Sequence, residues 1–70
     1  MVHMANQIAR FFASYPREEA VAGVADHLRK FWEKRMLQQI IEYTSRGGGG
    51  LDEIAVEAVK RLRLQKRVSV

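Results

Sequence analysis

Apolar residues recur at helical spacing along nearly the whole chain, and no segment shows the alternation typical of a strand. Between residues 4 and 15 the large apolar side chains fall at i, i+4, i+7, i+8 and i+11, which is one face of an α-helix: Met4, Ile8, Phe11, Phe12 and Tyr15. We therefore predict an all-α fold, a small bundle of three to four short helices.

Two breaks divide this pattern. Pro16 disfavours helical geometry at Tyr15, so we expect the first helix to end near Ala13 or Ser14. Two further helical stripes follow, made of Ala20, Val21, Val24, Leu28, Phe31 and Trp32, and of Met36, Leu37, Ile40, Ile41 and Thr44. One unbroken helix through both stripes would be long for a small domain, so we favour a break around Glu33-Lys34.

Gly23 lies inside the second predicted helix, where a glycine costs up to ~1 kcal/mol relative to alanine. Two interpretations stay open. Either the glycine is simply tolerated, or a neighbouring helix approaches closely at that turn.

Four consecutive glycines, residues 47–50, predict the end of the third helix and a flexible connector. They do not form a phosphate loop, because no strand precedes them and Leu51-Asp52-Glu53 follows in place of Lys-Ser/Thr. We expect Asp52 to cap a last amphipathic helix. A single helical domain then covers residues 1–63, and residues 64–70 form a basic flexible tail.

The composition narrows the possible functions. The chain has 70 residues, no Cys and two His, so disulfides are excluded and a zinc site is close to excluded. Iron–sulfur clusters usually need several Cys, so we expect none in this chain. Its small core must depend on good helix packing or on a partner. The net charge of +4 permits contact with nucleic acid or an acidic partner without requiring either.

We expect a cytoplasmic chain. The N-terminus lacks the basic segment and long apolar run of a signal peptide. No apolar stretch approaches the ~20 residues of a membrane span.

No residue pattern indicates catalysis, and we expect no catalytic, cofactor-binding or metal-binding residue. Asp26 and His27 are adjacent, but neighbours on a helix point about 100° apart and do not make an acid–base pair. His27 flanks the apolar face one turn before Phe31. A half-buried packing role is one interpretation of His27, and a catalytic or pH-sensing role is the other.

The aromatic residues favour a protein interface. Each adjacent pair, Phe11-Phe12 and Phe31-Trp32, either fills a wide apolar stripe inside the bundle or sends one member to a partner. Trp and Arg are enriched at the energetically dominant positions of interfaces. The predicted partner-binding patch is formed by Phe31, Trp32, Arg29, Arg35 and Met36, supported by His27 and extended by Phe11 or Phe12.

A second basic cluster lies near the C-terminus: Lys60, Arg61, Arg63, Lys66 and Arg67. It is either a solvated helix end or a contact for an acidic protein or nucleic acid. No aromatic residue interleaves with it, which weakens an interpretation as a stacking site for single strands.

The residues from about Met4 to Arg63 resemble the small delta subunit of NAD-dependent, molybdenum-containing formate dehydrogenases. The matching pieces are Asn6-Gln7-Ile8, Phe11-Phe12, the run from Ala20 to Trp32, Arg35-Met36 and Gly49-Gly50-Leu51-Asp52. The most specific is the His-x-x-x-Phe-Trp-x-x-Arg-Met run that begins at His27. One departure is Lys34, because the family commonly has Pro there, in Phe-Trp-Asp-Pro-Arg-Met.

The resemblance implies a cytoplasmic bacterial complex that oxidises formate to carbon dioxide with NAD, and can run in reverse. Its large subunit would hold a molybdenum or tungsten pterin-guanine-dinucleotide centre, and other subunits would hold iron–sulfur clusters, FMN and the NAD site. The delta subunit would be a non-catalytic accessory chain without a cofactor, which stabilises the large subunit or assists its cofactor-loaded state.

Two alternatives stay open. A small basic helical regulator would bind nucleic acid through residues 60–67, with steep salt dependence. An assembly chaperone would bind the immature large subunit and leave the mature enzyme.

Overall fold

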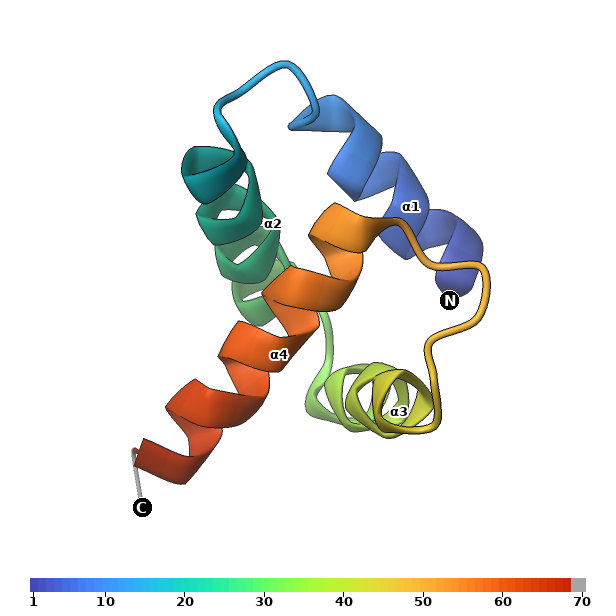
Figure 1. Cartoon of the computed structure of the whole chain (residues 1–70). Helices are drawn as coiled ribbons and strands as arrows, with labels where there is room; N and C mark the ends of the chain where they lie inside the picture. The colour runs from blue at the N-terminus through green and yellow to red at the C-terminus, as the bar shows by residue number, and fades with distance from the viewer. Residues whose placement is uncertain (69–70) are drawn as a thin grey trace.

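The chain folds into four α-helices in a computed structural model, which describes the backbone of residues 1–68 and the side chains of residues 1–64. No strand is present in this described part, so the all-α prediction is confirmed. The helices are labelled in Figure 1: α1, Val2–Phe11; α2, Arg17–Phe31; α3, Lys34–Ser45; and α4, Glu53–Val68.

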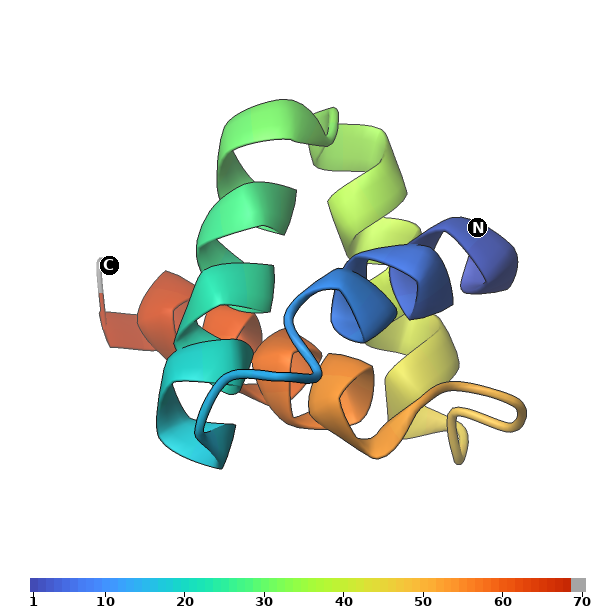
Figure 2. The ribbon, with the colours of Figure 1, turned by 90° about the horizontal axis from the view of Figure 1, so that it is seen from above.

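Helix α4 is the central element. It packs against each of the other helices, most extensively against α2, while α1 packs against α2 and α4. Figures 1 and 2 show α1, α2 and α3 arranged around α4. The core therefore lies along α4, and the outer faces of α1 and α2 are left to form the surface.

The helix boundaries follow local backbone chemistry. Helix α1 ends at Phe11, slightly earlier than expected, and a turn closed by the bond from the Tyr15 N–H to the Phe12 carbonyl leads to Pro16. The predicted break after α2 is confirmed. Trp32 and Glu33 take extended geometry, with ψ of 140° and 152°, so the chain leaves helical geometry there without a proline.

The core is rich in alanine, which lets the helices approach one another closely. Six alanines are buried: Ala5, Ala9, Ala20, Ala25, Ala55 and Ala58. The largest fully buried side chains are those of Leu28, Ile40, Val24 and Val59. A core of this composition buries little apolar area per residue, so its stabilising free energy is small.

The apolar stripe predicted for the first helix only partly faces the core. Ala5 and Ala9 are fully buried, and Ile8 and Phe12 pack against the core cluster. Met4, Phe11 and Tyr15 are exposed instead. The small alanines lie where α1 meets the other helices, which turns part of its large apolar side outward.

Gly23 marks a close contact between α2 and the segment after α1. A Cβ atom at this position would lie 2.6 Å from Cε1 and 2.8 Å from Cδ1 of Phe12. The contact comes from the aromatic side chain of Phe12, which follows α1. Gly23 therefore lies at a close approach, but what approaches is a ring and not a neighbouring helix.

The glycine connector is held by hydrogen bonds at three points. Gly47 and Gly48 end α3 with φ of 121° and 60°, a backbone geometry that favours glycine. The Tyr43 hydroxyl donates to the carbonyl of Gly49. From α1, the Asn6 amide donates to the carbonyl of Gly50 at 2.8 Å, and its oxygen accepts from the backbone N–H of Asp52 at 2.8 Å.

Asp52 caps α4 as predicted, since its Oδ1 accepts from the Ile54 N–H at 3.0 Å. Helix α4 continues to Val68, so the backbone of residues 64–68, assigned to the tail from the sequence, is helical. The side chains of Lys66 and Arg67 lie outside the described residues, as do residues 69 and 70 of the predicted tail.

Candidate docking surface

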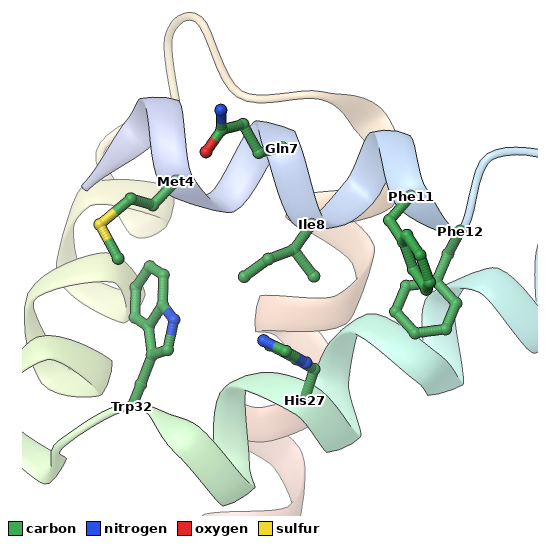
Figure 3. Close-up of a pocket in the computed structure, with 7 residues that line it drawn as sticks. All are labelled: Met4, Gln7, Ile8, Phe11, Phe12, His27 and Trp32. Carbon is green, nitrogen blue, oxygen red and sulfur yellow. The ribbon is translucent and has the colours of Figure 1, made fainter.

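An open groove of about 400 Å³ lies between α1 and the C-terminal half of α2. We call it the aromatic groove. Figure 3 shows its lining residues: Met4, Gln7, Ile8, Phe11, Phe12, His27 and Trp32.

Trp32 forms the wall of the aromatic groove at one end. Its extended backbone at the end of α2 turns the indole back toward the core, and only 8% of the residue is exposed. Met4 points toward the indole from α1 (Figure 3). Trp32 is therefore a core residue that reaches the surface only through the groove.

Three aromatic rings form a cluster at the other end. Phe11 and Phe12 meet edge to face with centroids 5.1 Å apart, and Phe12 lies 5.5 Å from Tyr15. Such geometry is favourable for aromatic pairs. Phe12 is half-buried and anchors the cluster over Gly23, while Phe11 is 72% exposed.

His27 joins the groove to the exposed end of α2. Its imidazole projects into the space between α1 and α2 (Figure 3), and its ring lies 4.8 Å from that of Phe31, with the planes tilted by 39°. His27 is half-buried, as the packing interpretation of this residue expects. Phe31 is 72% exposed, so Phe31 and not Trp32 is the outward member of this aromatic pair.

The cations of the predicted patch lie on α2 and α3 and do not line the groove; Arg29 lines a separate hollow with Arg61 of α4. Asp26 pairs with Lys30 at 3.1 Å and with Arg29 at 3.2 Å. The hydrogen bond from Lys30, together with the charges of Lys30 and Arg29, lowers the pKa of the Asp26 carboxyl below 3.8. Arg35 is exposed on the first turn of α3, and Met36 is half-buried against the core.

The fold brings together several of the predicted patch residues. Four of them line the groove, namely Phe11, Phe12, His27 and Trp32, and Phe31 joins it through His27. The sequence did not single out Met4, Gln7 and Ile8 as groove residues. For Met4 and Ile8 the available signal was their place with Phe11 on the predicted apolar face of the first helix, whereas polar Gln7 lies outside that face and gave no signal.

The arrangement suits binding of an apolar group. The groove walls are mostly apolar, and Gln7 and His27 supply its polar side chains. Within the described residues, no group of three or more His, Cys, Asp or Glu side chains could hold a metal ion. No helix among them is long and apolar enough to cross a membrane.

Comparison with known protein families gives a match over most of the chain. The sequence model of the family described as NADH-dependant formate dehydrogenase delta subunit FdsD matches residues 1–59. The match covers α1, α2, α3 and the first part of α4, and so includes the whole aromatic groove. No curated protein and no solved structure matches the chain significantly.

Proposed function

Because the chain belongs to the FdsD family of NADH-dependent formate dehydrogenase delta subunits, we propose that it is a non-catalytic accessory subunit of a cytoplasmic formate dehydrogenase complex. It docks on the large molybdenum or tungsten subunit and stabilises that subunit. Formate oxidation, the pterin centre, the iron–sulfur clusters, FMN and NAD belong to the other subunits.

The observation that carries this proposal is the exposure of two phenylalanines: Phe11, which lines the aromatic groove, and Phe31, which adjoins it through His27. Phe11 and Phe31 are each 72% exposed, and Met4, at the Trp32 end of the groove, is 45% exposed. Burying an exposed side chain of this size contributes about 2 kcal/mol of binding free energy. Large exposed apolar side chains gathered around a concave surface are typical of a protein-binding site.

The residues of the predicted patch take different roles in this proposal. Phe31 and Phe11 contact the partner directly, and Phe12 and Trp32 hold the groove walls in place. His27 keeps the Phe31 ring in position through their ring contact. Arg29, Arg35 and Met36 extend the contact along the α2–α3 turn.

Reconstitution with the tagged chain tests the proposal. The large subunit and its electron-transfer partners are purified without this chain, and binding is measured together with formate-dependent NAD reduction and its half-life at elevated temperature. The native chain is expected to bind in a defined ratio and to lengthen that half-life. Phe31→Ala and Phe11→Ala are each expected to weaken binding about tenfold or more.

Leu64→Ala is the matched control, because Leu64 is a 58% exposed apolar residue on α4 that does not line the groove. It is expected to bind like the native chain. Equal binding by all four chains would refute the docking surface. Binding to the cofactor-free large subunit alone, with release from the loaded enzyme, would identify the chain as an assembly chaperone instead.

A further inference from the structure

We propose that the turn between α2 and α3 binds an acidic patch on the partner subunit. The surface, which we call the basic corner, is formed by Arg29, Lys30, Phe31, Lys34 and Arg35. This inference rests on the proposed function and specifies the chemistry of the surface that the chain recognises.

Charge is concentrated at the basic corner. Residues 26–35 hold four cations against two acidic residues, Asp26 and Glu33, which leaves two positive charges in ten residues. Asp26 is already neutralised by its contacts with Lys30 and Arg29. Within the described part of the chain, Lys34 and Arg35 form no ion pair.

Lys34 and Arg35 lie where cations destabilise their own helix. They open α3, whose first turn contains no acidic residue, and the side chain of Glu33 makes no capping hydrogen bond. The N-terminus of a helix carries a partial positive charge, so a cation there costs about 0.3–1 kcal/mol. An acidic partner surface would offset this cost, because it neutralises the cations and the helix end together.

The basic corner is continuous with the aromatic groove. Phe31 belongs to the corner and contacts His27, which lines the groove. Phe31 is 72% exposed, with cations on either side of it in the sequence at the end of α2 and the start of α3. An exposed apolar anchor next to charged residues matches the anatomy of interfaces, in which an apolar centre has a charged rim. The charged rim then governs the association rate and the choice of partner.

Arg35→Glu is expected to change the stability of the fold and the affinity for the partner in opposite directions. In the isolated chain this substitution places an acid in the first turn of α3, so the Tm is expected to rise by about 2–5 °C. Its affinity for the formate dehydrogenase complex lacking this chain is expected to fall about tenfold or more. Affinity of the native chain is expected to fall about tenfold between 50 and 300 mM NaCl, because exposed charges are screened.

Arg17→Glu is the matched control. Arg17 is exposed in the first turn of α2, and the 15 residues of that helix put it ~20 Å from Phe31. The substitution makes the same change in charge and is expected to leave affinity within twofold of native.

Each result has a distinct meaning. If the native chain binds but neither Arg35→Glu nor salt weakens it, the acidic partner patch is wrong and the proposed function stands. If the native chain does not bind the complex at all, the proposed function fails and the inference fails with it. If Arg35→Glu abolishes retardation of single-stranded DNA and leaves complex formation unchanged, the corner faces nucleic acid and the inference is overturned.

Discussion

Gly23 lies against the ring of Phe12, and the space there is smaller than a methyl group requires. In Gly23→Ala, the new Cβ would come within 2.6 Å of Cε1 of Phe12, so the ring must shift, which disturbs its contacts with Phe11 and Tyr15. Overpacking of this kind costs about 1–3 kcal/mol, which exceeds the gain of about 1 kcal/mol in helix propensity. We expect a net loss of about 1 kcal/mol in unfolding free energy, measured by urea denaturation.

A double-mutant cycle distinguishes this collision from other causes. Phe12→Leu removes the ring, so adding Gly23→Ala in that background should stabilise the chain, as helix propensity alone predicts. A stabilising effect of Gly23→Ala in the native background would show that the ring yields at no cost.

Asn6 connects α1 to the glycine connector from 44 residues away. Its amide donates to the Gly50 carbonyl and accepts from the Asp52 N–H, both at 2.8 Å. Asn6→Ala leaves both backbone groups without this partner, and each lost hydrogen bond costs about 0.5–1.5 kcal/mol. We expect a loss of about 1–2 kcal/mol, together with faster amide hydrogen exchange at Asp52. Gln7→Ala, one residue along and exposed, should leave both quantities near native.

Helix α2 carries two ion pairs on its own surface, Asp26–Lys30 and Asp26–Arg29. The pKa of the Asp26 carboxyl measures the strength of both pairs. Lys30 and Arg29 lower the pKa of the Asp26 carboxyl below 3.8 in the folded chain. Since the folded pKa is depressed, the contribution of these pairs is present above pH 3.8 and is lost as the pH falls through the folded pKa.

Lys30→Gln is expected to raise the pKa of Asp26 back toward 3.8, because it removes the largest cause of the shift. NMR titration of the Asp26 Cγ resonance measures this directly. Lys60→Gln removes an exposed cation that is not among the causes of the Asp26 shift, and should leave the Asp26 titration unchanged. An unchanged pKa in Lys30→Gln would assign the depression to another group.

The positions of the helices along the chain were largely predictable from the sequence. Helical spacing and Pro16 located α1 and α2, and Asp52 located the start of α4, because these signals are local. The orientation of α1 was not predictable from its large apolar residues. Ala5 and Ala9 face the core because close packing of helix backbones favours small side chains. A pattern based on the large apolar residues predicts a different buried face.

Several aromatic residues of the candidate site were predictable from the sequence, but which of their rings are exposed was not. The Phe31-Trp32 pair was expected at a partner surface, yet its exposed member is Phe31. Adjacent residues diverge by about 100° on a helix, and the chain leaves α2 between them, so the sequence could not say which ring turns inward. The bonds of Asn6 to the connector had no local signature, because their partners are 44 and 46 residues away.

The whole molecule combines a small core with large exposed aromatics. A chain of 70 residues buries only about 60% of its unfolded surface, and its stability is expected to be a few kcal/mol. The core depends on few large side chains, of which Leu28 is fully buried. Binding to a partner adds to this stability by mass action.

Two substitutions on α2 test the buried core and the exposed aromatic surface separately: Leu28→Ala and Phe31→Ala. Leu28→Ala leaves a cavity and costs about 2–5 kcal/mol, which is comparable with the whole stability of the isolated chain. We expect its circular dichroism to show a largely unfolded chain at 37 °C. Phe31→Ala removes a 72% exposed ring, so its Tm should stay within about 3 °C of native.

The same two variants separate folding from docking when a saturating amount of the formate dehydrogenase complex is added. Leu28→Ala keeps the aromatic groove residues and should regain helical structure on the complex, with its apparent affinity reduced by the free energy of folding. Phe31→Ala should stay folded and bind weakly at every concentration. The reverse pattern, tight binding by Phe31→Ala and none by Leu28→Ala at saturation, would mean that the partner recognises a surface other than the exposed end of α2.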